Sequence, residues 1–512
     1  MSYKDIRYDH AIIGSGISGL ICAAYLSRKG KKVIVLEKNH QIGGCLQVFS
    51  RDKKIFDTGV HYIGGLGNDH VLKRLLDFIG IGHKLKFEQL NIDGFDKIVF
   101  ENDQTSYLMP QGWDNLVEKL GIEFPQEKAG LTSLVKDILD TIDLFGPYNL
   151  EELSEDSLTL DVLKRGAFEV INKHIKDPKL IAVLGGNSLL YCGDADTTPF
   201  YVFALIVNSY VEGAYRMVNG SSQISKFLSG IIHEQGGSIQ KYAEVHSIVM
   251  NEGRVETIHF GNGGKLNTGQ CIAGIHPERL LDMIPAGHLR STFGERIRSL
   301  KNGNSFISVY FSIKPNVLPY FNHNIYVLKD TEAAWNADPV YDESWPKSVL
   351  ISTGCEEKNQ QFCNTVNVLA YCDYELFRQW EDSFNTTAEQ SFRGSDYELL
   401  KEELIEKMIK KVEGQIPGFR EMYFSIYSST PLTYRDFINA PGGTAYGIEK
   451  DHNDPLYSFV SAKTKIPNLL LTGQSTDLHG VYGASISALL TLQNLEEGKD
   501  IFHEIREFNS GW

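Results

Sequence analysis

Residues 8–19 of the chain read YDHAIIGSGISG, and this stretch decides the fold. The first half is a short strand that ends in apolar residues, and the second half is a complete GxGxxG motif. Gly14 permits the tight turn, Gly16 lets a pyrophosphate approach the backbone, and Gly19 allows the next helix to pack closely on the strand. We predict that helix over residues 20–31, with its N–H groups and positive dipole end directed at phosphates.

A second strand and an acidic residue follow the predicted helix. Residues 32–36, KVIVL, are typical of a buried parallel strand, and Glu37 comes directly after them. A carboxylate at this point accepts hydrogen bonds from a ribose 2′-hydroxyl and disfavours a 2′-phosphate. The order strand, glycines, helix, strand and acid therefore predicts a Rossmann-like dinucleotide-binding unit.

The carboxy-terminal region repeats the order of strand, glycine-bearing loop and helix. Residues 468–473, NLLLTG, predict a buried strand, and an apolar helix follows the loop and runs to about residue 492. Such an arrangement offers N–H donors to a pyrophosphate or to the N1–C2=O edge of a flavin. We therefore expect the two ends of the chain to meet around one cofactor.

Four sequence blocks resemble the all-trans-retinol saturases, a branch of the phytoene desaturase and carotenoid isomerase superfamily of FAD-dependent oxidoreductases. The blocks are FDTGVHYIG at 56–64, GSSQI at 220–224, TPLT at 430–433 leading to APGGTAYG at 440–447, and LTGQ at 471–474. The Glu37-Lys38 pair before Gly43-Gly44 also resembles the FAD-specific extension of flavin amine oxidases and phytoene desaturases. The resemblance implies a two-electron, FAD-dependent change at a conjugated double bond of an apolar polyene or other lipid.

The motifs and the resemblance together imply a site for non-covalently bound FAD. In the resembling proteins the segment matching residues 57–62 runs beside the flavin, and a valine in the place of Val245 contacts the adenine. The predicted cofactor-binding residues are Gly14, Ser15, Gly16, Ile17, Ser18, Gly19, Glu37, Lys38, Gly43, Gly44, Cys45, Gly59, Val60, His61, Tyr62, Val245, Gly473, Gln474, Gly480, Val481, Tyr482 and Gly483.

Hydride chemistry at a double bond also needs a group that gives or takes a proton. The candidates are His61 and Tyr62, which the motif places near the flavin, with Tyr446 and Tyr482 behind them. Each of these side chains is equally compatible with a structural hydrogen bond or a pocket wall.

The fold class that we predict is α/β. Because 512 residues exceed one ordinary hydrophobic core, we expect two domains. One is a Rossmann-like FAD-binding domain of parallel sheet, helices and a β-meander, and the other is an α+β substrate domain. Residues 200–207, FYVFALIV, are the most apolar run. They suit a core element, a substrate tunnel or peripheral contact with one membrane leaflet. The FAD-binding domain is expected to comprise 1–65, 213–299 and 451–512, and the substrate domain, with more helical periodicity, 66–212 and 300–450.

Composition excludes several other classes of protein. A formal net charge of −15 argues against nucleic acid as a partner. The seven cysteines contain no CxxC pair, which argues against a disulfide framework and a zinc site, so we expect no metal. The chain starts close to its first strand and has no carboxy-terminal retention signal, and a cytoplasmic location is therefore expected.

Some alternatives stay open on the sequence alone. Saturation, desaturation and redox-neutral cis–trans isomerisation would use the same cofactor and pocket. No second strand–GxGxxG–helix unit appears, so we expect a separate electron donor or acceptor. A non-enzymatic carrier of prenylated proteins, such as the Rab escort proteins, would share the fold, although those relatives lose flavin contacts that are intact here.

Overall fold

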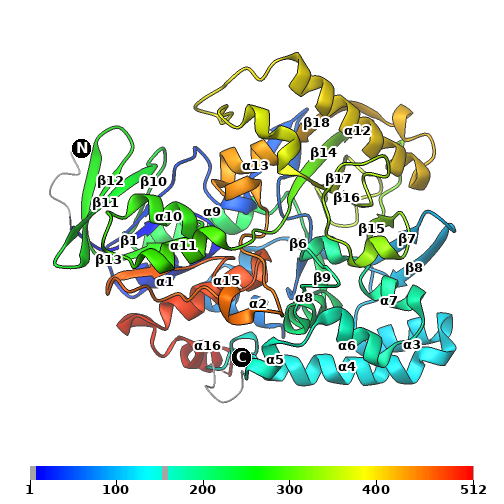
Figure 1. Ribbon diagram of the computed structural model, residues 1–512, viewed down its shortest axis with the longest axis horizontal. Helices are drawn as coiled ribbons and strands as arrows, with labels where there is room; N and C mark the ends of the chain where they lie inside the picture. Colours follow the sequence, from blue (N-terminus) through cyan, green and yellow to red (C-terminus); the bar gives the residue numbers. More distant parts are fainter. Residues whose placement is uncertain (1–6, 153–158, 511–512) are drawn as a thin grey trace.

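The computed structural model describes residues 7–152 and 159–510, and its strands gather mainly into two seven-stranded sheets (Figure 1). The first sheet has the order β10-β2-β1-β13-β12-β11, with β19 also paired to β13. Its strands are β1 (Arg7–Ile13), β2 (Val33–Leu36), β10 (Ser238–Gln240), β11 (Val245–Asn251), β12 (Arg254–Phe260), β13 (Gly264–Ala273) and β19 (Leu469–Leu471).

Strand β13 joins the two parts of this sheet. It pairs in parallel with β1 on one side, while on its other side the first half pairs with β12 in antiparallel fashion and the last three residues pair with β19 in parallel. Strands β10, β2, β1 and β19 therefore form the parallel part, and β11, β12 and β13 form a meander. This arrangement confirms the predicted fold class.

Three helices cover one face of the first sheet: α1 (Ile17–Arg28), α9 (Ser222–Glu234) and α15 (Gly480–Leu492). Helix α1 packs against both others and is buried along almost its whole length. The prediction that it starts at residue 20 was wrong, because Gly16 already serves as its N-cap. The Ser18 hydroxyl donates a 2.6 Å hydrogen bond to the Ala484 carbonyl, so the first and last of these helices are tied together.

The second sheet has the order β18-β14-β17-β16-β15-β7-β8. Alternate residues face opposite sides, as the period of a strand requires. Phe306 and Leu350 pack into the core shared with the first sheet, whereas Ile307 and Ile351 pack beneath α12 (Ser395–Gln415). The strands are β7 (Asp96–Phe100), β8 (Thr105–Met109), β14 (Ser305–Ile313), β15 (Asn324–Leu328), β16 (Ser348–Thr353), β17 (Thr365–Cys372) and β18 (Tyr423–Ser429).

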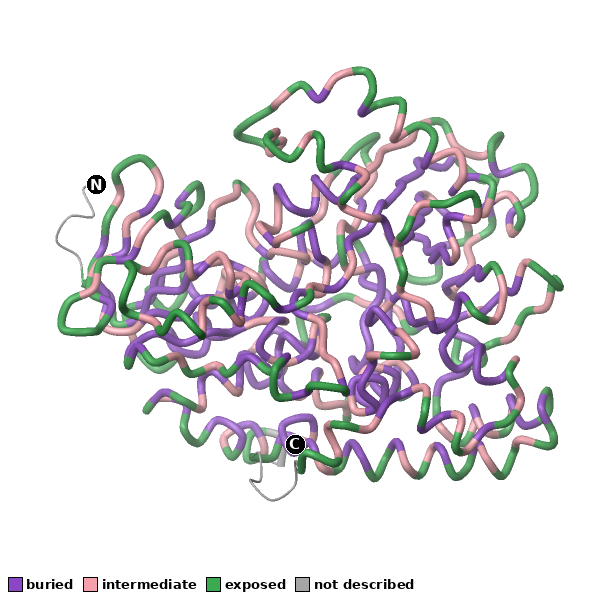
Figure 2. The backbone as a smooth tube through the Cα atoms, viewed as in Figure 1, coloured by how far each residue is buried: buried purple, intermediate pink, exposed green. Residues whose placement is uncertain are grey.

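The described part of the segment 113–212, which follows β8, is largely helical. Its main helices are α3 (Trp113–Glu123), α4 (Lys128–Asp143), α6 (Ala167–His174), α7 (Pro178–Leu184) and α8 (Phe200–Glu212). Helix α8 contains the most apolar run and is buried against α4 and α6, which fits a core element. Figure 2 shows the contrast with α4, where buried and exposed residues alternate along the rim. The sequence predicted more helical periodicity for 300–450 than the structure shows, because this range supplies most strands of the second sheet.

Short elements complete the chain. A two-stranded sheet and a three-stranded sheet, ordered β5-β9-β6, connect the larger layers. None of the helices within the described ranges combines the length and hydropathy that a bilayer crossing requires. The division into two interleaved domains stays a prediction. The remaining elements are β3 (Val48–Arg51), β4 (Lys54–Asp57), β5 (Ile63–Gly64), β6 (Phe87–Gln89), β9 (Ala214–Met217), α2 (Val71–Ile79), α5 (Leu160–Leu163), α10 (Pro277–Met283), α11 (Ser291–Ser299), α13 (Pro431–Ile438), α14 (Pro455–Ser458) and α16 (Ile501–Ser510).

Candidate cofactor and substrate site

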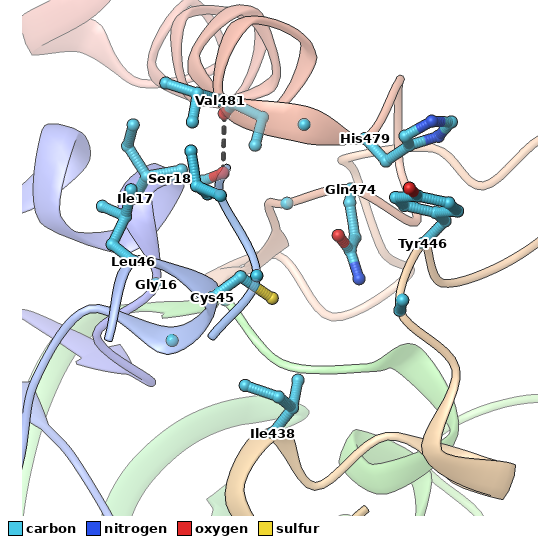
Figure 3. A pocket seen from close by; sticks show the side chains of 18 of the residues that line it. Gly16, Ile17, Ser18, Cys45, Leu46, Ile438, Tyr446, Gln474, His479 and Val481 are labelled. Carbon is cyan, nitrogen blue, oxygen red and sulfur yellow. Dashed lines mark hydrogen bonds between the residues drawn. The ribbon is translucent and has the colours of Figure 1, made fainter. Parts of the chain in front are cut away.

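One pocket lies at the carboxyl ends of the parallel strands and extends to the second sheet. Figure 3 shows Gly16 and Cys45 on one side of it and Gln474, Tyr446 and His479 on another. Every site residue predicted from the sequence lines this pocket: Gly14, Ser15, Gly16, Ile17, Ser18, Gly19, Glu37, Lys38, Gly43, Gly44, Cys45, Gly59, Val60, His61, Tyr62, Val245, Tyr446, Gly473, Gln474, Gly480, Val481, Tyr482 and Gly483.

The three motif glycines face different surroundings. A Cβ atom at Gly14 would lie 2.9 Å from the Gly274 carbonyl oxygen, and the residue has a φ of +90° that favours glycine. A Cβ at Gly19 would lie 2.6 Å from the Gly14 carbonyl oxygen, so close packing of α1 requires this glycine. A Cβ at Gly16 would meet no protein atom within 4 Å. The space beside Gly16 is open to a ligand, as a dinucleotide phosphate requires.

Two helices begin at the rim of the pocket. Helix α1 starts after Gly16 and α15 starts after His479, and neither N-cap residue makes a side-chain capping hydrogen bond. The first N–H groups of a helix have no partner within the helix, so they remain available to an anion. Together with the open side of Gly16, these two helix ends fit the pyrophosphate of a dinucleotide.

Glu37 is held in a fixed position at the end of β2. One carboxylate oxygen accepts hydrogen bonds from the Ser15 hydroxyl at 2.5 Å and the Ser15 N–H at 3.1 Å, and the other accepts from the Asn39 N–H at 2.8 Å. The side chain is buried but lines the pocket. Carboxylate oxygens have further lone pairs, so this anchored group can accept hydrogen bonds from a ribose.

The neighbouring Lys38 also lines the pocket, and its ammonium group is already bonded to the protein. Its ammonium group donates a 2.6 Å hydrogen bond to the Asp436 carbonyl at α13. Burial lowers the pKa of Lys38, although nearby Glu244 and Glu37 oppose that shift. The lysine therefore ties the first sheet to α13, next to the pocket wall formed by Ile438.

The loop between β19 and α15, together with Tyr446, forms another wall of the pocket. The rings of Tyr446 and His479 lie 4.3 Å apart, and both side chains are fixed by main-chain carbonyls. The Tyr446 hydroxyl donates to Leu189 at 2.9 Å, and a His479 ring nitrogen lies 2.8 Å from the Leu190 oxygen. The sequence prediction missed His479, whose one available signal was its place immediately before Gly480 at the start of the helix.

The four proton-transfer candidates have different hydrogen-bond partners. Neither ring nitrogen of His61 has a partner among the described residues, and burial lowers the pKa of this imidazole to about 4, with nearby Arg216 acting in the same direction. The Tyr62 hydroxyl donates to Asp96 at 3.0 Å. The Tyr482 hydroxyl donates to a main-chain carbonyl at 3.1 Å, as that of Tyr446 does. Tyr446 and Tyr482 therefore resemble pocket walls, whereas His61 lines the pocket and has two buried ring nitrogens without a partner among the described residues.

The end of the pocket that faces the second sheet is apolar and aromatic. Its walls come from α8, from strands β14, β16 and β17, and from α13. Side chains of this kind bind a ligand through burial of hydrocarbon surface. The lining residues here are Leu189, Leu190, Leu205, Ile206, Tyr210, Phe306, Leu350, Leu369, Tyr434, Phe437 and Ile438.

The side chains that could bind a metal ion are dispersed over the fold. Across the part of the chain that the structure describes, no three His, Cys, Asp or Glu side chains gather in an arrangement that could hold a metal ion. All seven cysteines are free.

Comparisons with known proteins agree with this geometry. The family model for an NAD(P)-binding Rossmann-like domain matches residues 12–79. The chain is 28% identical to an all-trans-retinol 13,14-reductase of Rattus norvegicus, over 94% of this chain and 85% of the relative. It is 26% identical to a chloroplastic prolycopene isomerase of Daucus carota, over 92% of this chain and 76% of the relative. These similarities, which span more than nine-tenths of this chain, confirm the resemblance to the retinol saturase-like branch.

Solved structures support the same fold. A triple mutant of putrescine oxidase superposes with a TM-score of 0.65 at 15% identity, and the match covers 97% of this chain and 99% of that chain. At this level of identity the likeness concerns the fold alone.

Proposed function

We propose that this chain is an FAD-dependent oxidoreductase that acts on carbon–carbon double bonds of an apolar polyene. The observation that carries the proposal is the composition of one pocket. A glycine-lined groove, open beside Gly16 and bounded by the anchored carboxylate of Glu37, continues into an apolar chamber. A dinucleotide fits the first part and a hydrocarbon chain fits the second.

The residues of this chain have distinct tasks in that site. We assign Glu37 to the ribose and the starts of α1 and α15 to the pyrophosphate, so that FAD is held without a covalent bond. When bound, the flavin supplies hydride transfer. The chamber residues orient the double bond and exclude water. His61, with free ring nitrogens, is placed to hydrogen-bond at the reacting centre.

Saturation is the reaction we favour, with desaturation and isomerisation as alternatives. The names of the relatives support double-bond chemistry on polyenes, since one group consists of retinol 13,14-reductases and the other of prolycopene isomerases. Electrons are exchanged with a separate donor or acceptor. The carrier alternative is less favoured, because the motif glycines and Glu37 are intact and the space beside Gly16 is open. The cytoplasmic location and peripheral membrane contact stay predictions.

The first test is whether the purified protein binds FAD. We expect flavin absorbance as isolated or after incubation with FAD, and release of the intact cofactor on denaturation. A protein that stays colourless after incubation with FAD would favour the carrier.

The second test identifies the reaction. The reduced, FAD-loaded protein is mixed anaerobically with a panel of retinoids, carotenoids and shorter polyenes, and products are analysed by mass and retention time. Saturation predicts a gain of two hydrogens by the substrate and reoxidation of the flavin. A loss of two hydrogens with the oxidised protein would indicate desaturation, and an unchanged mass with altered retention would indicate isomerisation. A sample without reductant is the control for saturation.

A further inference from the structure

A buried carboxyl group lies directly behind the pocket wall. Asp96, the first residue of β7, is completely inaccessible to solvent. One of its oxygens accepts a 3.0 Å hydrogen bond from the Tyr62 hydroxyl, and the other accepts a 2.9 Å hydrogen bond from the side-chain amide of Asn324. The Asn187 amide lies 3.4 Å from the first oxygen. All of these partners are neutral.

The surroundings of Asp96 favour its protonated form. Burial raises the pKa of Asp96 to about 7, against the opposing effect of its hydrogen bonds and of Arg216. The guanidinium of Arg216 does not contact the carboxyl group, because it donates to the Asn324 side-chain oxygen at 3.0 Å. The other titratable groups around Asp96 are the phenols of Tyr62, Tyr326 and Tyr210.

A second buried aspartate has a different set of partners. Asp436 is equally inaccessible, yet Arg393 and Arg435 each place a guanidinium nitrogen 2.6 Å from its oxygens. Ion pairs of this kind compensate a buried negative charge. Asp96 has no such contact, so a proton is the simplest way to neutralise it.

Tyr62 connects Asp96 to the ligand space. Its side chain lines the pocket, its ring lies 4.7 Å from that of Tyr210, and its hydroxyl is 2.6 Å from the hydroxyl of Tyr326. When Asp96 is protonated, its O–H can donate along the same 3.0 Å contact to the Tyr62 oxygen, which leaves the phenolic proton of Tyr62 available to the pocket. His61 has no such supply, because its ring nitrogens have no partners among the described residues and its pKa is lowered to about 4.

We propose that Tyr62 is the proton donor of this pocket and that Asp96 is the buried residue that resupplies it. The inference rests on the proposed function, with saturation as the reaction. Reduced FAD, when bound, would supply the hydride for one new C–H bond. The π electrons of the double bond take the phenolic proton of Tyr62 and form the second. In the same step the Asp96 proton moves to the Tyr62 oxygen, so that no tyrosinate is formed. The carboxylate regains a proton from solvent before the next turnover, while a separate two-electron donor reduces the flavin again.

The test compares the FAD-loaded wild-type protein with Asp96→Asn, which keeps the size of the side chain and has no acidic proton. We expect FAD binding to be retained and single-turnover reduction of the polyene to be about 100-fold slower or more, the usual range for loss of a general acid. The wild-type rate falls as the pH rises through the pKa of Asp96, and this alkaline decline disappears in the variant. Tyr326→Phe is the matched control: it removes one hydrogen bond from the same hydroxyl and is expected to slow the reaction by about tenfold or less.

A readout independent of turnover measures the proton itself. Infrared difference spectroscopy of the protein without substrate is expected to show the C=O stretch of a protonated carboxyl group at pH 6, with loss of the band by pH 8. The band is absent from Asp96→Asn. It persists in Asp477→Asn, which removes a partly buried carboxyl group that accepts a hydrogen bond from a tyrosine.

The outcomes separate this inference from the proposed function. If the protein binds no FAD or leaves every polyene unchanged, both fail. If wild-type protein reduces a polyene and Asp96→Asn does so with the same rate and pH profile, only the proton supply is overturned. Absence of the Asp96 band at pH 6 in an active enzyme also overturns it.

Discussion

The two ends of the pocket are built from different materials. At one end the ligand space is bounded by glycines, main-chain N–H groups and the ends of α1 and α15, from segments near both termini. At the other end large side chains from α8 and the second sheet form the wall. Asp96 lies behind this wall, where it is hydrogen-bonded to Tyr62 and Asn324. Binding through main-chain N–H groups requires glycines at fixed spacings, so few substitutions are tolerated at those positions. A side-chain wall depends instead on volume and on the charge state of buried groups.

The largest effect is expected at the side-chain end and concerns pH. Burial raises the pKa of Asp96 from its ordinary value of 3.8 to about 7. Between these two pH values Asp96 is protonated in the folded protein but ionised in the unfolded chain. Its contribution to stability is complete below about pH 3.8 and is lost as the pH rises through about 7, with an upper limit of about 4 kcal/mol. Asp96→Asn is neutral at every pH and should gain stability relative to wild type across this range. Denaturant unfolding from pH 5 to pH 8 measures it, and parallel curves for the two proteins would contradict it.

The next effect belongs to the main-chain end. Gly19→Val places a Cβ 2.6 Å from the Gly14 carbonyl oxygen, so α1 must move away from β1. We expect a loss of about 3 kcal/mol in the free energy of unfolding, or failure to fold. Chemical denaturation or a thermal melt gives the value, and a loss below about 0.5 kcal/mol would be inconsistent with the close packing.

Gly16→Val separates ligand binding from folding at the same motif. Its side chain enters open space, so stability is expected to change by less than about 1 kcal/mol. It occupies the proposed pyrophosphate position, and FAD affinity should fall about 100-fold, equivalent to about 2.7 kcal/mol. Calorimetric titration with FAD measures the affinity. Gly414→Val, at an exposed and uncrowded position in α12, is the matched control and should bind FAD as wild type does.

His61→Ala tests the boundary between the two ends. The variant removes the unpartnered ring nitrogens without altering the glycine-lined groove, so FAD binding should persist. We expect the half-reaction with the polyene to slow by about tenfold, the value of one hydrogen bond at the reacting centre. Stopped-flow single-turnover kinetics provide the rate, and an unchanged rate would remove His61 from the mechanism.

The smallest effect is expected for Tyr482→Phe. Its hydroxyl donates to the Tyr148 carbonyl, so the change removes one hydrogen bond and preserves the ring in the pocket wall. We expect a loss of about 1 kcal/mol in stability and a single-turnover rate within about twofold of wild type. A rate loss as large as that of Asp96→Asn would reassign the proton step to Tyr482.

The parts of the fold that the sequence predicted are those with local signatures. The order of β1, α1 and β2 with Glu37 follows from glycines and apolar runs within a short segment, and the structure places these elements together. Strand β13 was missed because its first half, GKLNT, is polar and only its last residues are apolar. Its role as the joining strand arises from its pairing with β1 and β19, which lie far away in the chain.

The residues at the side-chain end of the site could hardly be predicted from the sequence. Tyr62 was selected because of a motif, but Asp96 stands at the start of an ordinary strand, and nothing near it in the sequence signals a partner. Their contact depends on the packing of β7 against the segment after β4. The charge state of Asp96 in turn depends on Asn324, which lies 228 positions further along the chain. Such groups become visible only when distant segments are brought together.

The hydrogen bond between Ser18 and Ala484 joins positions 466 residues apart. During synthesis the amino-terminal motif leaves the ribosome long before the helix that completes its groove. On the proposed function, the FAD groove is therefore complete only after α15 has been made and has packed on α1. A premature stop or a proteolytic cut near the carboxyl end would abolish cofactor loading while leaving every residue of the GxGxxG motif in place.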